Sequence, residues 1–271
     1  MKTFEVGIIQ MHVDNDKSKN LQTAYNFIKK ICSQKIDFIV LPEMFCCPYD
    51  IANFPIYAEY ENGETYTFLS SVAKEFGIYL VAGSIPEIDS SNKIYNTSYV
   101  FDRKGNQIAK HRKIHLFDIQ IDGGQQFKES DIISPGESIT VFETEYGKLG
   151  LNICYDFRFP ELSRKMVENG AKAIITPAAF NMTTGPIHWD ILFKSRAIDN
   201  QVYTIGCAPS RNYDSSYVSY GNSLVISPFG NIINRMDEKE GFIVTTLDFN
   251  YVDKVRNELP LLEHIRKDVY I

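Results

Sequence analysis

The sequence predicts an α/β protein in which large mixed β-sheets are covered by helices, with residues 1–271 in one domain. Two observations lead to this fold class. Apolar runs of strand length alternate with amphipathic helical patterns, as in parallel strands joined by crossover helices. Other strand-like runs return through short turns, as in antiparallel hairpins. Because both kinds of connection are present, we expect the sheets to be mixed.

The chain begins with a βαβ pattern. Residues 5–12 and 37–41 are apolar runs typical of buried strands. Residues 17–32 between them have the apolar spacing of an amphipathic helix. Asp14-Asn15-Asp16 precede this helix and are residues typical of a helix N-terminus. The first unit is therefore expected to place two parallel strands side by side, with a helix on one face.

The pattern continues with a helix over 65–76 that Gly77 ends and a strand over 78–84. Three hairpins are expected where two strand-like runs flank a short turn that contains Gly. They pair residues 94–102 with 107–111, 138–143 with 148–153, and 223–227 with 232–236. The remaining elements are helices over 160–169, 188–201 and 252–258 and strands over 173–176, 202–208 and 241–248.

Composition and charge exclude several classes of function. The chain has 28 Lys+Arg and 34 Asp+Glu, a net charge of −6, which disfavours nucleic-acid binding. No stretch approaches the roughly 20 apolar residues that span a bilayer, and the N-terminal segment has no signal-peptide layout. The five cysteines are odd in number and form no C-x-x-C motif, which argues against a disulfide framework and a zinc ribbon. We therefore expect a cytoplasmic protein with no nucleic-acid or membrane partner.

Three residues that could carry chemistry each follow a strand-like run: Glu43, Lys113 and Cys154. Glu43 comes directly after an apolar strand, where it is either a buried general base or an exposed loop residue. Lys113 lies in a basic segment that could equally be a solvated cluster. Together a thiol, a carboxylate and an ammonium are the parts of an acyl-transfer site. In such a site the thiol attacks, the carboxylate moves protons and the ammonium stabilises the oxyanion.

Cys154 is expected at a strand-to-helix turn, because Pro160 and Glu161 favour a first helical turn shortly after it. Backbone N–H groups at such a turn favour the thiolate, although the G-x-S-x-G pattern of serine elbows is absent. A buried and inert cysteine is the alternative. Cys32 and Cys207 are expected in the core, since one follows a helical apolar pattern and the other lies within a strand.

Two other kinds of site stay open at this point. A Cys–His pair of the papain kind is the main rival, and His111, His115 and His188 are available for it. None of the three histidines has a local signature of its own. A metal site is a weaker possibility, because neither H-E-x-x-H nor a paired-cysteine spacing occurs in the sequence.

Three segments resemble the signatures of the nitrilase superfamily of carbon–nitrogen hydrolases: Leu41-Pro42-Glu43, His111-Arg112-Lys113-Ile114-His115-Leu116-Phe117 and Asn152-Ile153-Cys154-Tyr155-Asp156-Phe157-Arg158-Phe159-Pro160-Glu161. The resemblance extends from residue 4 to the C-terminus, and the three signatures occur in the right order. Within the superfamily the chain is most similar to the ω-amidase (Nit2-like) branch. Four further segments support this branch: residues 113–119, 127–130, 179–189 and 195–203.

The resemblance implies a four-layer αββα sandwich that forms a homodimer across a helical face. It also implies a Glu43–Lys113–Cys154 triad, with Glu129 as a second carboxylate near the thiol. In the implied mechanism Glu43 takes the proton of Cys154, which attacks a primary amide. Lys113 and the backbone N–H of Tyr155 stabilise the oxyanion. Ammonia leaves and water hydrolyses the thioester, with no metal or organic cofactor.

The resemblance also implies a small anionic substrate. ω-Amidases act on short dicarboxylate monoamides such as α-ketoglutaramate and α-ketosuccinamate. Arg158, four residues after Cys154, could bind the substrate carboxylate, unless it forms a surface ion pair with Glu161. The resemblance adds three more residues to this pocket: Phe180, Thr184 and Tyr49.

The same residues bear on three alternatives to ω-amidase activity. A Nit1-like deaminated glutathione amidase shares the triad, but residues 181–184 and 199–201 favour the ω-amidase branch. A nitrilase is disfavoured, because Cys154 begins a Cys-Tyr-Asp run rather than the Cys-Trp-Glu of nitrile-cleaving branches. A catalytically silent scaffold on the same fold usually lacks a triad residue. Selective alkylation of Cys154 by a soft reagent would distinguish an enzyme from such a scaffold.

Overall fold

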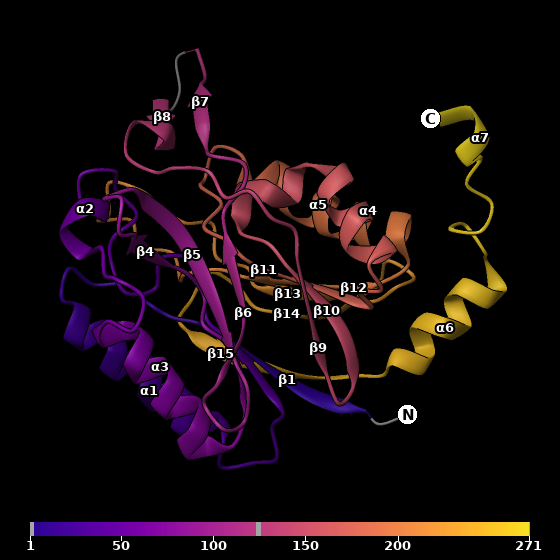
Figure 1. Ribbon diagram of the computed structural model, residues 1–271, viewed down its shortest axis with the longest axis horizontal. Helices are drawn as coiled ribbons and strands as arrows, with labels where there is room; N and C mark the ends of the chain where they lie inside the picture. Colours follow the sequence, from indigo (N-terminus) through magenta and orange to yellow (C-terminus); the bar gives the residue numbers. More distant parts are fainter. Residues whose placement is uncertain (1–2, 123–125, 271) are drawn as a thin grey trace.

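Two mixed β-sheets form the centre of the structure, a computed structural model that describes residues 3–122 and 126–270. The first sheet has the strand order β15 (Gly241–Leu247), β1 (Phe4–Gln10), β2 (Phe38–Val40), β3 (Tyr79–Val81), β5 (Ile94–Phe101) and β4 (Ile85–Ile88), and β6 (Gln107–Arg112) also pairs with β5. The second has the order β14 (Ile232–Arg235), β13 (Leu224–Ile226), β12 (Tyr203–Cys207), β11 (Ala173–Pro177), β10 (Gly147–Leu151) and β9 (Thr140–Thr144). A separate pair, β7 (Asp118–Gln120) and β8 (Gln126–Lys128), projects from the body of the molecule (Figure 1).

Each sheet has a parallel centre with antiparallel strands beside it. Strands β1, β2 and β3 run parallel, and so do β10, β11 and β12. The parallel strands are joined by four crossover helices: α1 (Lys17–Ile31), α3 (Glu64–Phe76), α4 (Pro160–Glu168) and α5 (Gly185–Asn200). Helices α1 and α3 cover the first sheet, and α4 and α5 cover the second (Figure 1). The prediction of two mixed sheets covered by helices is confirmed.

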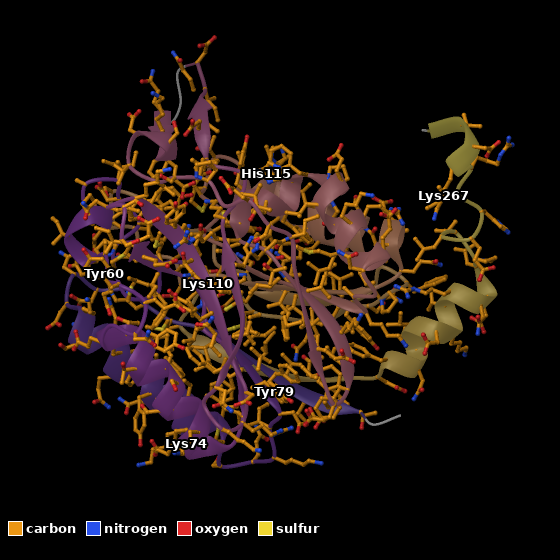
Figure 2. All side chains as sticks on the ribbon, viewed as in Figure 1. Tyr60, Lys74, Tyr79, Lys110, His115 and Lys267 are labelled. Atoms are coloured by element: carbon orange, nitrogen blue, oxygen red, sulfur yellow. The ribbon has the colours of Figure 1, made fainter. Side chains whose placement is uncertain are left out.

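Three apolar cores fill the spaces between the four layers. Figure 2 draws the described side chains on the same ribbon. Strand β1 contributes to two of the three cores. Val6 and Ile8 belong to the core between the sheets, whereas Ile9 belongs to the core under α1, with Ala24 and Ile28. Because both faces of the central strands are buried, their sequences are continuous apolar runs rather than alternating ones.

The three predicted hairpins are confirmed as the pairs β5–β6, β9–β10 and β13–β14. The sequence patterns do not predict five of the helices and strands: α2 (Phe54–Tyr57), β4, β7, β8 and α7 (Lys267–Tyr270). Strand β4 lies at the edge of its sheet, where Pro86 is tolerated, but proline interrupts a strand-like pattern. Helix α5 begins at Gly185 rather than at residue 188, because Pro186 fits the first turn of a helix.

The C-terminal helices α6 (Phe249–Glu258) and α7 (Lys267–Tyr270) extend to one side of the sandwich, in yellow in Figure 1. Helix α6 begins earlier than the predicted residue 252, because the Asp248 carboxylate accepts from the N–H of Asn250 and caps it. In the part of the chain that the structure describes, no helix combines the length and apolarity needed to cross a membrane. Residues 1, 2, 123–125 and 271 of the predicted domain lie outside the described residues. Residues 1 and 2 also begin the N-terminal segment that was considered for a signal peptide.

Candidate active site

The Glu43 carboxylate is buried three residues after the end of β2. Its Oε2 accepts a hydrogen bond from the backbone N–H of Ala179 at 2.8 Å, and its Oε1 accepts one from the Asn96 amide at 2.9 Å. The loop is closely packed at this point, since a Cβ on Gly83 (φ +57°) would lie 2.1 Å from the carbonyl oxygen of Pro42. The exposed-loop alternative for Glu43 is therefore wrong.

Lys113 directly follows β6, and its side chain is fully buried. Its Nζ lies 3.1 Å from Glu43 Oε1, 2.8 Å from Glu129 Oε2 and 3.3 Å from the hydroxyl of Tyr49. Burial lowers the pKa of Lys113, but the carboxylates of Glu129 and Glu43 more than offset this, so that its pKa lies well above the ordinary value. Lys113 is thus a buried ammonium rather than part of a solvated cluster.

Glu129 begins a short 3₁₀ turn (Glu129–Asp131) directly after β8 and is also fully buried. Its Oε2 accepts from the backbone N–H of Phe117, just before β7, at 2.7 Å. Burial raises the pKa of Glu129, the Lys113 ammonium lowers it, and the nearby Glu43 raises it again. One ammonium is therefore shared between two buried carboxylates, which come from distant parts of the chain.

Cys154 begins a 3₁₀ turn (Cys154–Arg158) three residues after β10, with φ at +47°. This left-handed backbone is unusual for a residue with a side chain and is found at strained turns that present a nucleophile. Burial raises the pKa of the thiol well above its ordinary value and the charge and hydrogen bond of Glu43 raise it further, although Lys113 lowers it. The expectation that the turn favours the thiolate is therefore wrong, because burial and the Glu43 carboxylate raise the pKa of the thiol more than Lys113 lowers it.

Asp156 connects the turn of Cys154 to the segment that carries Lys113. Its Oδ2 lies 3.0 Å from Nε2 of His111, and its Oδ1 accepts from the backbone N–H of His115 and contacts the Nδ1 of that ring, both at 2.8 Å. The other ring nitrogen of His111 lies 2.9 Å from Thr140 Oγ1. Burial raises the pKa of Asp156, but the two histidines lower it far more. Both ring nitrogens of His111 are thus occupied in positioning rather than available as a base for Cys154.

Arg158 lies beside Cys154 in a small, closely packed pocket, whose other lining residues are Phe117, Tyr155, Ala179, Phe180, Thr184 and Tyr217. Its guanidinium carbon is 4.6 Å from the centre of the Phe180 ring. Among the described residues, no carboxylate lies within ion-pair distance of Arg158, so the predicted alternative of a pair with Glu161 is wrong. Burial lowers the pKa of Arg158. The pocket therefore presents an uncompensated cation near the thiol.

Tyr49 lies on another side of the same cluster. Its hydroxyl is 3.3 Å from Glu43 Oε1 and 3.4 Å from Glu129 Oε1. Together with Glu43 and Cys47 it lines a second, larger cleft of about 380 Å³, which extends to the loops after β1 and β12. The ring of Tyr217 packs against Tyr49 at 4.5 Å and contributes to both cavities.

The sequence patterns do not predict four residues of the cluster: Asn96, Phe117, Asp156 and Tyr217. Asn96 lies within β5 and Tyr217 in a long loop, and neither position has a local pattern that would single it out. Asp156 and Phe117 lie within two of the segments that resemble the superfamily signatures. The sequence does not predict which residues they contact. The assembled site, with a buried thiol beside a carboxylate and an ammonium, is suited to nucleophilic acyl transfer.

Comparison with known proteins agrees with this chemistry. Residues 5–257 match the model of the carbon-nitrogen hydrolase family. The chain is 45% identical over 270 residues to the omega-amidase NIT2 of Xenopus tropicalis, covering 100% of this chain and 98% of the relative. The omega-amidase NIT2 of Homo sapiens is 42% identical with the same coverage. The omega-amidase NIT3 of Saccharomyces cerevisiae is 45% identical over 98% of this chain and 94% of its own.

Solved structures lead to the same family. The crystal structure of Saccharomyces cerevisiae Nit3, described as a member of branch 10 of the nitrilase superfamily, superimposes with a TM-score of 0.91. It is 42% identical, with coverage of 98% of this chain and 97% of that one. The Caenorhabditis elegans NitFhit protein also has a TM-score of 0.91, at 32% identity, over 99% of this chain and 66% of its own. This chain therefore belongs to the carbon–nitrogen hydrolase family, within the nitrilase superfamily that the three sequence signatures indicated.

Proposed function

We propose that this chain is an ω-amidase, which hydrolyses the terminal amide of short dicarboxylate monoamides such as α-ketoglutaramate and α-ketosuccinamate. The products are the dicarboxylate and ammonia. The observation that carries the proposal is the Arg158 guanidinium, which shares a pocket with Cys154 and has no acidic partner within ion-pair distance among the described residues. Such a cation is suited to bind a carboxylate at the far end of an amide whose carbonyl lies at the thiol. The similarity to omega-amidases over the full chain supports the same substrate class.

In the proposed reaction Glu43 takes the proton of Cys154 as the thiolate attacks the amide carbon. Burial and the Glu43 carboxylate raise the pKa of the Cys154 thiol, so that a base has to take its proton, which supports this role for Glu43. The oxyanion is stabilised by the Lys113 ammonium and the backbone N–H of Tyr155. Glu43 then gives its proton to the departing nitrogen, so that ammonia leaves and a thioester remains.

Water completes the proposed cycle. Glu43 takes a proton from a water molecule as it attacks the thioester. The C–S bond then breaks, Glu43 returns that proton to the Cys154 sulfur, and the product leaves as a carboxylic acid that loses its proton to solvent. Glu129 orients the Lys113 ammonium through its 2.8 Å contact, and Tyr49 bonds to the same group. The reaction uses no metal or organic cofactor. In this proposal Phe180 and Thr184 complete the carboxylate end of the pocket around Arg158.

Replacing Arg158 by methionine should raise the KM for α-ketoglutaramate by about ten- to a hundredfold, because hydrogen bonds to a charged group contribute about 1.5–3 kcal/mol. Ammonia release at varied substrate concentration measures this change. Alkylation of Cys154 by uncharged iodoacetamide should keep its rate, since the thiol and Glu43 are untouched. Arg164→Met on α4 is the matched control and should keep both values. An unchanged KM for the anionic amide would refute the carboxylate-binding role.

We further propose that the protein is a homodimer that associates across α5. Ile187, Ile191 and Ile198 lie on one face of this helix and are 64%, 61% and 44% exposed. Their spacing of four and seven residues places them along one stripe. A contiguous exposed apolar stripe is typical of a surface that a partner covers, and a second copy offers an equal apolar surface.

Ile191→Asp should therefore convert the dimer into a monomer. Sedimentation equilibrium should report twice 31.0 kDa for the parent protein and 31.0 kDa for the variant. Ile56→Asp on α2 is the control, because Ile56 is 76% exposed and lies away from the α5 stripe. If Ile191→Asp keeps the parent mass, or if the parent is already a monomer, the proposed interface is wrong.

We also propose that residues 1–271 form one domain that works in the cytoplasm. The pairing of β1 with β15, in register from Phe4 with Leu247, supports a single domain, because it brings distant ends of the chain into one sheet. All five cysteines are free thiols, which supports a reducing compartment.

A further inference from the structure

Arg158 is held in place by neutral acceptors. Its Nη1 lies 3.0 Å from Nδ1 of His188, and its Nη2 donates to the Oγ1 of Thr184 at 3.1 Å. The Phe180 ring supports one side of the guanidinium. These contacts fix the direction in which the guanidinium points, since two of its nitrogens are tied to residues at the beginning of α5.

The contact between Arg158 and His188 settles the state of the imidazole. A guanidinium has only donors, so Nδ1 of His188 must carry the lone pair that accepts, and the ring must be neutral. Burial lowers the pKa of His188 and the positive charge of Arg158 lowers it further, which agrees with a neutral ring. His188 therefore orients the Arg158 guanidinium without neutralising its positive charge. A carboxylate at this position would orient the guanidinium equally well but would also cancel that charge.

The position of His188 is itself well defined. Its backbone N–H donates to the carbonyl of Thr184 at 2.8 Å in the first turn of α5. Thr184 in turn is tied to Asn181, whose Oδ1 accepts from both its N–H and its hydroxyl. The neighbouring Trp189 is fully buried and donates to the carbonyl of Asn222 at 2.8 Å. The turn that carries His188 is thus anchored on both sides.

We infer that His188 is a positioning residue that makes the pocket selective for amides with a distal carboxylate, by orienting Arg158 through a neutral acceptor. The inference rests on the proposed function, because it concerns the carboxylate end of the same substrate. Its distinctive content is that His188 acts by accepting a hydrogen bond while remaining uncharged. A side chain without a hydrogen-bond acceptor, or one with a negative charge, would not replace it.

Three substitutions separate these possibilities. His188→Ala removes the acceptor and should raise the KM for α-ketoglutaramate about tenfold, with kcat within about threefold of the parent. His188→Asn offers a neutral carbonyl oxygen near the place of Nδ1 and should restore the KM to within about threefold. His188→Asp should raise the KM at least as much as alanine, because its carboxylate competes with the substrate for Arg158. His264→Ala, at an exposed histidine, is the control and should match the parent.

A second measurement does not depend on turnover. Glutarate or α-ketoglutarate should protect Cys154 from iodoacetamide, and half-protection should need about tenfold more of either dicarboxylate in His188→Ala than in the parent. A parent protein that releases no ammonia yet shows this difference would overturn the proposed ω-amidase reaction but support the role of His188. Equal protection and equal KM in the alanine variant would overturn the inference about His188. An asparagine variant as impaired as alanine, or an aspartate variant that matches the parent, would overturn it too.

Discussion

Replacing Cys154 by alanine should lower ammonia release from α-ketoglutaramate by about 10⁴-fold or more, because loss of a catalytic nucleophile removes the covalent route altogether. Cys154 is the thiol that lines the pocket with Arg158, and the Glu43 carboxylate raises its pKa. The smaller side chain needs no rearrangement of the strained turn. Stopped assays with purified protein, followed over hours, measure the residual rate.

Two further variants make this result specific. Cys154→Ser keeps the size and polarity of the side chain but should be almost as inactive, because a hydroxyl is a far weaker nucleophile than a thiol beside the same carboxylate. Cys32→Ala, at the half-buried end of α1, should keep the parent rate. Ammonia release by Cys154→Ala at more than about a hundredth of the parent rate would show that another group attacks the amide.

Local patterns revealed those parts of the fold and site whose partners are close in sequence. The hairpin β5–β6 and the helices α1 and α3 follow from turns, caps and periodicity, and so does the position of Glu43 after an apolar strand. The order of the strands could not be predicted in this way, since β1 pairs with β15 across almost the whole chain. The four-layer arrangement came only with the resemblance to the superfamily.

The electrostatics of the site were beyond local patterns for a similar reason. Glu43, Lys113 and Glu129 are far apart in sequence, and only the packed structure shows one ammonium shared by two carboxylates. The thiolate expectation at Cys154 failed because it considered the turn alone and not the burial beside Glu43. Likewise, the neutral partners of Arg158 are His188 and Thr184 at the beginning of α5, and the sequence around Arg158 does not reveal them.

The network around Lys113 predicts that Lys113→Met should destabilise the fold and lower activity at the same time. Removing one partner of a buried ion pair typically costs about 3–5 kcal/mol of unfolding free energy, because the remaining charge stays buried without compensation. Here the two carboxylates of Glu43 and Glu129 would lose their shared ammonium. Urea unfolding at neutral pH measures the loss, and the rate of ammonia release should fall by about a hundredfold or more, as when an oxyanion donor is removed.

The pH dependence of Lys113→Met tests the electrostatic origin of this loss. Burial raises the pKa of Glu129 and Lys113 opposes the rise, so that the variant should have a still higher pKa at Glu129. A group whose pKa is raised by folding contributes stability at low pH and loses it as the pH rises through the folded value. The deficit of the variant should therefore shrink as the pH falls from 8 towards about 5. Adding Glu129→Gln should recover part of the stability at neutral pH and none of the activity, because the buried charge is relieved while the oxyanion still lacks its ammonium. A deficit that does not vary with pH, or full activity in the double variant, would show that Lys113 fills space rather than carrying charge.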